Sequence, residues 1–365
     1  PAINGMVVEV TGVASNNFDN YFVKYNTDVW EETVKPATPI NIKNTKFPHL
    51  LIRTADGNFR FTQIDGSSYT ISATSYDVPT LGSRVAGDLN SAPDPSFIGK
   101  KINDIFFHRN RLGVLADENV IMSRSGEFFE FFPETVTSTL DTDPIDVAST
   151  HTKVSILQHA VSFDEELLLF SEQSQFMVTG GATLTASNIS INVTTEFEAD
   201  KKVKPVGSGS NVFFTFAKGN FTGVREFFVA SDTDTKKADD ITANVPKFIP
   251  ANVFKLATST TENILIALSS DEDNALYVFQ YYVAQNKRLQ SAWHKWTYGS
   301  TTSDKILNVD FIENTLFIVN ERSDGVYLET IDVSPALTDS GETYLTHLDR
   351  KINNTQITES YNAGT

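Results

Sequence analysis

The stretch ILIALSSDEDNALYVF at residues 264–279 shows how this chain is built. Two apolar runs, 264–268 and 276–279, flank the polar residues 271–274. Neither run has the apolar spacing of an amphipathic helix. Short runs of aliphatic, aromatic and β-branched residues that end at Asp and Asn are typical of antiparallel strands joined by a turn. The stretch therefore predicts a β-hairpin.

The same arrangement recurs along most of the chain. Apolar runs that meet across a polar turn lie at residues 50–61, 112–123, 167–178, 212–228, 264–279 and 316–329. Four-stranded propeller blades commonly repeat at about 40 to 50 residues, and blades stack because one sheet alone cannot bury both its faces. We predict an all-β fold, a β-propeller of about six antiparallel blades. A chain of β-sandwich domains is the alternative.

Both ends of the chain depart from this repeat. Short strands at 6–10, 21–25 and 29–33 precede a Pro-bearing connector at 35–48, which predicts a small N-terminal β meander over residues 1–48. The propeller is then expected over 49–338. Strands at 344–348 and 356–358 would connect 339–365 to a following domain that the chain does not complete. The chain is expected to be a central fragment of a longer protein.

The composition excludes several kinds of function. The chain carries 46 acidic and 29 basic residues, a formal charge of −17, and no Cys. Without Cys there are no disulfides, thiol nucleophiles or Cys-based metal sites. The acidic excess argues against tight binding of nucleic acid, which needs clustered Lys and Arg. There is no apolar run long enough for a membrane span, so no membrane insertion is expected.

Motifs that carry catalysis are sparse. The six His residues form no His-Glu-x-x-His pattern, and there is no Gly-x-Ser-x-Gly elbow and no phosphate-binding loop. Asp141, Asp143 and Asp146 are spaced so that they could hold Ca²⁺ or act as a glycosidase pair. The Gly and the bidentate Glu of an EF-hand loop are missing, however, and Pro144 favours a stiff connector. We interpret this segment as a structural loop and expect no enzyme activity and no cofactor, with a cation site as the alternative.

One region, residues 93–147, is distinctive: it contains PDPSFIG at 93–99, INDIFFHRNRLG at 102–113, ENVIMSRSGEFFEFFP at 118–133 and DTDPIDV at 141–147. Arg109 and Arg111 alternate with neighbouring residues, which predicts that both project from one face of a strand and are suited to pairing with carboxylates. The pairs Phe128-Phe129 and Phe131-Phe132 predict core packing, which stabilises by roughly 2 kcal/mol or more for each fully buried ring.

Together with VWEET at 29–33 and PHLLIR at 48–53, these stretches resemble the tail tubular protein B family, the nozzle proteins of short-tailed bacteriophages (podoviruses). The 1–48 meander would then be part of a platform-like domain. The residues that carry the family pattern are Arg109, Asn110, Arg111, Leu112, Gly113, Ser123, Arg124, Phe128, Phe129, Phe132, Pro133, Asp143 and Pro144.

The resemblance implies a protein made in the host cytoplasm and carried in the virion. It implies a hexamer below the tail adaptor (gatekeeper) ring, with tail fibres outside and a channel through which the genomic DNA is ejected. An acidic lumen would let DNA pass without tight binding. A hypothesis of another class is a glycan-binding or glycan-hydrolysing propeller at the host surface, which needs two carboxylates about 5 to 10 Å apart beside an aromatic platform. A third is a cellular propeller scaffold.

Overall fold

The computed structural model describes residues 2–13, 15, 20–150, 155–230, 235–284, 287–298 and 304–334. These residues form strands and a short 3₁₀ turn, η2 (Asn44–Lys46), and they contain no α-helix. The predicted all-β class is therefore confirmed. Nothing in this part of the chain is a helix of the length and apolar character that a membrane span requires. The predicted strands at 344–348 and 356–358 lie outside the described residues.

The chain divides into two compact units. The first contains the described residues up to Leu256 together with Ala267–Glu272, and the second contains Ala257–Ile266 and the described residues from Asp273 onward. The residues discussed below as a candidate site all belong to the first unit.

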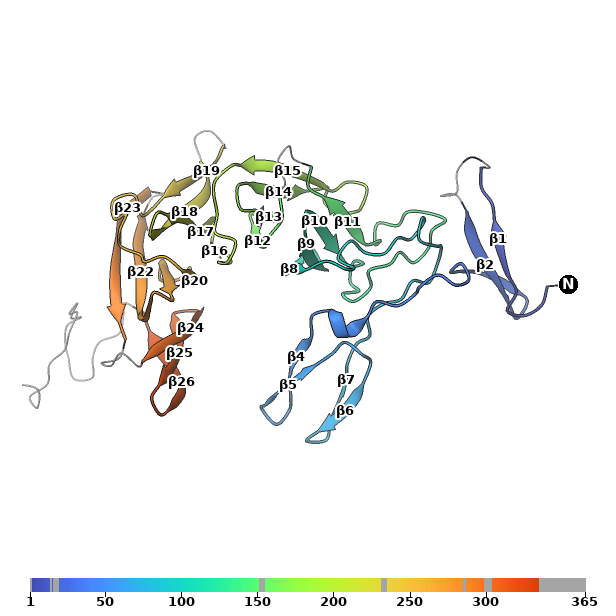
Figure 1. The fold of residues 1–365 in the computed structure, drawn as a ribbon, viewed down its shortest axis with the longest axis horizontal. Coiled ribbons are helices and arrows are strands. Elements are labelled where there is room, and N and C mark those ends of the chain that lie inside the picture. The colour runs from blue at the N-terminus through green and yellow to red at the C-terminus, as the bar shows by residue number, and fades with distance from the viewer. Residues whose placement is uncertain are drawn as a thin grey trace, which may run out of the picture. The chain divides into compact units, whose positions relative to one another are not determined.

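Most of the structure consists of four-stranded antiparallel sheets in which neighbouring strands are consecutive in sequence. In Figure 1 these sheets are coloured by residue number, from teal for β8 to orange for β23. The first two sheets are β8 (Ile102–His108), β9 (Arg111–Ala116), β10 (Asn119–Met122) and β11 (Ile145–Ala148), then β12 (His159–Phe163), β13 (Glu166–Phe170), β14 (Gln175–Thr179) and β15 (Ser190–Thr195). The next two are β16 (Val206–Ser208), β17 (Asn211–Lys218), β18 (Phe221–Ala230) and β19 (Thr235–Asp240), then β20 (Val253–Ser259), β21 (Ile264–Ser269), β22 (Glu272–Ala284) and β23 (Lys287–Thr297).

A three-stranded sheet follows, made of β24 (Lys305–Ile312), β25 (Thr315–Arg322) and β26 (Gly325–Asp332). The hairpins predicted from residue 112 onward are confirmed as the two middle strands of each four-stranded sheet and as β25–β26. The flanking strands were not predicted individually.

Within the first unit, consecutive sheets pack face to face. One apolar cluster joins β9 and β10 to β12, β13 and β14, and includes Leu115, Val120, Leu167 and Phe176. A second joins β13 and β14 to β17 and β18, and includes Phe170 and Phe214, whose ring centroids are 5.2 Å apart. Up-and-down antiparallel sheets packed on their neighbours in sequence are the repeating units of a β-propeller. The structure therefore agrees with the predicted fold class.

The segment before these sheets is built from smaller pieces. β1 (Val7–Val10), β2 (Tyr21–Asn26) and β3 (Val29–Thr33) form the predicted three-stranded meander. The hairpin predicted at 50–61 is present as β4 (Leu50–Arg53) and β5 (Phe59–Thr62), but it is a two-stranded sheet rather than part of a four-stranded one. β6 (Ser68–Ile71) and β7 (Thr74–Asp77) form another two-stranded hairpin.

A third apolar cluster fixes the long connections around the first four-stranded sheet. Phe47, Phe97 and Phe131 come from three separate connections and meet with ring centroids 5.2 to 5.7 Å apart. They pack on Val114 and Ile121, which lie in β9 and β10. This aromatic cluster therefore packs on β9, the strand that also carries Arg111, Leu112 and Gly113 of the family pattern.

Candidate functional site

Arg109 lies in the turn between β8 and β9, not on a strand. β8 ends at His108 and β9 begins at Arg111, and Arg109 and Asn110 both have positive φ, 44° and 60°. Two-residue hairpin turns of type I′ require positive φ at both central residues, a conformation that Asn tolerates well. The prediction that Arg109 and Arg111 share one strand face is therefore wrong, because the turn separates them.

The partners of both arginines are backbone carbonyls rather than the predicted carboxylates. Arg109 donates from Nη1 to the Gly181 carbonyl at 2.7 Å. Arg111 is buried and only 1% exposed. It donates to five carbonyl oxygens: from Nη1 to Ser123 at 2.7 Å, Thr142 at 3.3 Å and Asp143 at 2.6 Å, and from Nη2 to Asp141 at 2.8 Å and Leu184 at 3.2 Å.

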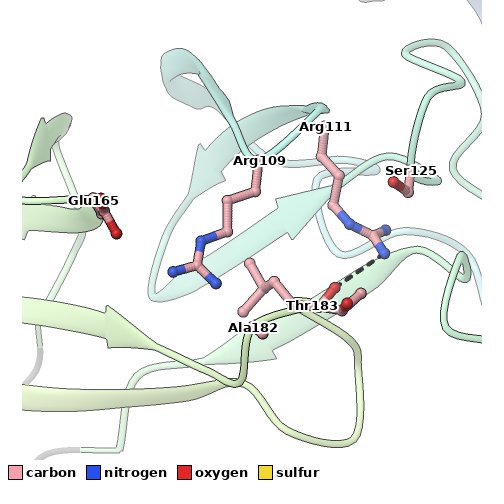
Figure 2. Close-up of a pocket in the computed structure, with 7 residues that line it drawn as sticks. Arg109, Arg111, Ser125, Glu165, Ala182 and Thr183 are labelled. Atoms are coloured by element: carbon pink, nitrogen blue, oxygen red, sulfur yellow. Dashed lines mark hydrogen bonds between the residues drawn. The ribbon is translucent and has the colours of Figure 1, made fainter.

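Arg111 thereby cross-links three segments. The acceptors lie after β10, in the connection before β11, and in the β14–β15 connection of the next sheet. Figure 2 shows the Arg111 guanidinium reaching the strand-connecting segment that carries Ala182 and Thr183. Burial lowers the pKa of Arg111 and the nearby Asp143 charge opposes this shift. A guanidinium starts from so high a pKa that it stays charged, and its donors suit carbonyls in a fixed geometry.

The three aspartates considered as cation ligands have separate roles in the structure. Asp143 is buried, and its Oδ2 accepts the Leu140 N–H at 2.7 Å. Asp146 lies in β11, where its Oδ2 accepts the Ser96 N–H at 2.7 Å. Asp141 supplies a carbonyl to Arg111. No group of three or more His, Cys, Asp or Glu side chains suited to a metal ion occurs in the described part of the chain.

Leu112, Gly113 and Ser123 hold the start of β9 against the end of β10. Ser123 is fully buried; its Oγ accepts the Leu112 N–H at 3.1 Å, and its N–H donates to the Leu112 carbonyl at 2.8 Å. Gly113 pairs with Phe106 across the sheet, and a Cβ at Gly113 would lie 2.1 Å from the Phe106 Cζ. A glycine is therefore required beneath that ring.

The chain that follows Ser123 is fixed by ion pairs and rings. Arg124 pairs with Glu127 at 2.8 Å and with Glu134 at 2.6 Å. Phe131 and Phe132 are buried, 4% and 3% exposed, as predicted. Phe128 and Phe129 are only half-buried, and Phe128 packs its edge on Phe107 at 5.1 Å. Pro133 and Pro144 are half-buried in the connection between β10 and β11.

A second buried arginine, Arg84, was missed by sequence analysis. It is 2% exposed, donates from Nε to the Ala92 carbonyl at 2.7 Å and from Nη2 to Asp94 Oδ1 at 2.6 Å, and also donates to the Pro39 carbonyl. Its guanidinium lies 4.6 Å from the centroid of the Phe132 ring. Nothing in its Gly/Pro/Ser-rich surroundings distinguishes it from a solvated arginine. Arg84 does not lie in a strand, so the alternation of side chains that drew attention to Arg111 gives no signal at Arg84.

A cavity of about 580 Å³ lies beside the arginine turn, lined by Arg109, Arg111, Ser125, Glu165, Ala182, Thr183 and Leu184 (Figure 2). The Arg111 donors in its wall are already engaged by carbonyls. The chemistry of this region is that of a structural cross-link, in which a permanent charge holds backbone acceptors of several loops.

Comparison with solved structures finds similarity at low sequence identity. The WD40 domain of Toxoplasma gondii coronin is 12% identical with a TM-score of 0.41, covering 86% of this chain and 76% of that one. Kluyveromyces lactis Hsv2p is 10% identical with a TM-score of 0.40, covering 86% of this chain and 71% of that one.

Sequence comparison gives a specific assignment. The chain is 34% identical over 368 residues to the tail tubular protein gp12 of Escherichia phage T7, an alignment that covers all of this chain and 44% of that protein. The chain thus spans less than half the length of this curated relative. Residues 1–365 match the bacteriophage nozzle protein family. The chain therefore belongs to the bacteriophage nozzle protein family and is a structural component of a phage tail, carried in the virion.

Proposed function

We propose that this chain forms part of the wall of a hexameric channel through which the phage genome is ejected. The observation that carries the proposal is the match to the nozzle family along the whole chain. In this proposal residues 1–48 belong to a platform-like domain, residues 49–338 form the propeller, and residues 339–365 lead into a following domain. The outside of the ring meets the tail fibres, and one end of it meets the adaptor ring.

The structure of the first unit suits a wall. Its sheets share continuous apolar cores, and Arg111 ties a loop of one sheet to a loop of the next. An interior packed in this way is poorly compressible and resists deformation. The described residues therefore support a mechanical role, and we propose conduction of DNA rather than catalysis.

The charge of the chain supports passage of DNA without adhesion. Several basic side chains are already paired with carboxylates: Lys204 with Asp104 at 2.8 Å and Lys218 with Asp240 at 2.7 Å. The chain has 46 acidic residues against 29 basic ones. Tight non-specific binding needs unpaired clustered cations that displace counterions from the phosphates. An acidic lumen is the consequence we propose.

Two measurements test this function. Electron microscopy of the full-length protein should show a hollow six-fold cone; a globular monomer or a solid particle would contradict the channel. Titration of double-stranded DNA with the 365-residue chain at physiological salt should give a Kd weaker than about 1 μM, the tight end of ordinary non-specific binding. Tighter binding would contradict the repulsive lumen. Hydrolysis of polysaccharide above a denatured control would favour the glycan-processing alternative.

A further inference from the structure

A groove with an apolar floor and a basic rim lies between two connections of the first unit. Its volume is about 580 Å³, and its walls come from residues 39–47 and 94–102. Phe47 and Phe97 form the floor, both 5% exposed, with ring centroids 5.5 Å apart. Ile98, which is 43% exposed, forms part of the rim. The groove is of a size that ordinarily receives a ligand or a few side chains.

The groove is held open by the fold. The Phe47 N–H donates to the Asn44 carbonyl at 3.2 Å, and the Ile98 N–H donates to the Pro95 carbonyl at 2.9 Å, so both walls are closed turns. Buried Arg84 donates to the Pro39 carbonyl and to Asp94, which places one residue of each wall on the same guanidinium. A preformed site of this kind loses little conformational entropy when a partner binds.

Three lysines surround this apolar floor. Lys43, Lys46 and Lys100 all line the groove. Lys100 pairs with Asp117 at 3.2 Å, whereas within the described residues no ion pair is found for Lys43 or Lys46, which are exposed. The acid in the groove wall, Asp94, is engaged by Arg84. The rim is therefore positive on a chain whose net charge is −17.

We infer that this groove docks an acidic segment with apolar side chains from a second copy of the same protein. The apolar floor favours side chains over a phosphate backbone, because phosphate contacts gain nothing from buried rings. With 46 acidic residues against 29 basic ones, another copy carries acidic segments whose charge is opposite to that of the basic rim. A ring requires such a heterologous contact, in which one surface meets a different surface of the next copy. The inference rests on the proposed hexameric channel and assigns one of its contacts.

The test uses the full-length protein and a charge reversal in the groove. Lys43→Glu combined with Lys46→Glu should raise the protein concentration needed for half-maximal ring assembly by at least tenfold, measured by mass photometry. Lys202→Glu combined with Lys247→Glu is the matched control, since both of these lysines are exposed and the change in charge is the same. The control should assemble like the wild type, and circular dichroism should show all three proteins folded.

A photo-crosslinking residue at exposed Thr45, between the two rim lysines, identifies the occupant. Crosslinks from Thr45 to a second copy of the chain are expected. The inference is overturned if rings form but the groove variant assembles like the control. It is also overturned if Thr45 crosslinks only to another tail protein. Neither result contradicts the proposed hexameric channel. If the wild type forms neither rings nor Thr45 crosslinks between copies, both the groove contact and the hexameric channel are refuted. Crosslinks between copies without rings would support the groove contact and refute only the hexameric channel.

Discussion

Replacement of Arg111 by Met should destabilise the first unit substantially. Met has a similar length and packs well in irregular spaces, but it donates no hydrogen bond. Three carbonyls now 2.6 to 2.8 Å from the guanidinium would each lose a charged donor, and two weaker contacts at 3.2 and 3.3 Å would also be lost. Hydrogen bonds to charged groups contribute about 1.5 to 3 kcal/mol each, partly offset by apolar packing of Met and by water reaching the loop. We expect a loss of about 3 to 5 kcal/mol in the free energy of unfolding.

Urea unfolding followed by fluorescence measures this change, and amide exchange locates it. Protection should fall first around residues 141–143 and 184, whose carbonyls Arg111 holds. Arg109→Met is the control. Arg109 is exposed and donates to the Gly181 carbonyl, so its replacement should change stability by no more than about 0.5 kcal/mol. If the free energy of unfolding of Arg111→Met were within about 0.5 kcal/mol of the wild-type value, the Arg111 hydrogen bonds would not stabilise the fold and the reasoning would be refuted.

Three further predictions concern packing and pH. Gly113→Ala should cost about 1 to 3 kcal/mol by overpacking, whereas Gly207→Ala, whose added Cβ meets its nearest atom at 3.6 Å, should be tolerated; equal melting temperatures for the two would contradict this. Phe132→Ala should cost about 3 to 5 kcal/mol, since the ring is 3% exposed, and an unchanged urea midpoint would show that it does not belong to the core. Burial lowers the pKa of His108 and of His159, so unfolding takes up protons and stability should fall as pH drops below about 6.5. The double variant with Gln at both positions should show a shallower loss between pH 7 and 5 in urea titrations, and an identical slope would exclude these histidines as its source.

The sheet hairpins were predictable because their signal is local. Alternating or continuous apolar runs that end at Asp, Asn and Gly place both strands and the turn within about 16 residues, as at 264–279. Outer strands such as β11 (Ile145–Ala148) and β16 (Val206–Ser208) are three or four residues long and carry no comparable pattern. Their strand character comes from the neighbour with which they pair, which a single sequence does not display.

The site was predictable in composition but not in geometry. The family pattern identified Arg111. The prediction that Arg109 lies on the same strand face assumed that residues 109 and 110 continue the strand. Both residues have positive φ and form a turn. Arg is not among the residues preferred at such turn positions, so the sequence did not indicate the turn. Gly113 is explained only by the Phe106 ring across the sheet, and Arg84 only by carbonyls up to 45 residues away in sequence.

The two buried arginines explain how an antiparallel sheet accommodates the long connections of this protein. The connection between β10 and β11 runs from residue 123 to 144, far longer than a hairpin turn, and it lies outside the strands of the sheet. Buried carbonyls without donors are costly, so a long connection over a core needs donors from outside its own backbone. Arg111 supplies them from the first residue of β9, and Arg84 does the same for the connections at Pro39 and Ala92. Each guanidinium donates to carbonyls of more than one connection. A displacement of one connection that moves the arginine therefore weakens its hydrogen bonds to the other connections as well. The loops are thereby coupled to the sheets, which is consistent with the proposed role in a channel wall.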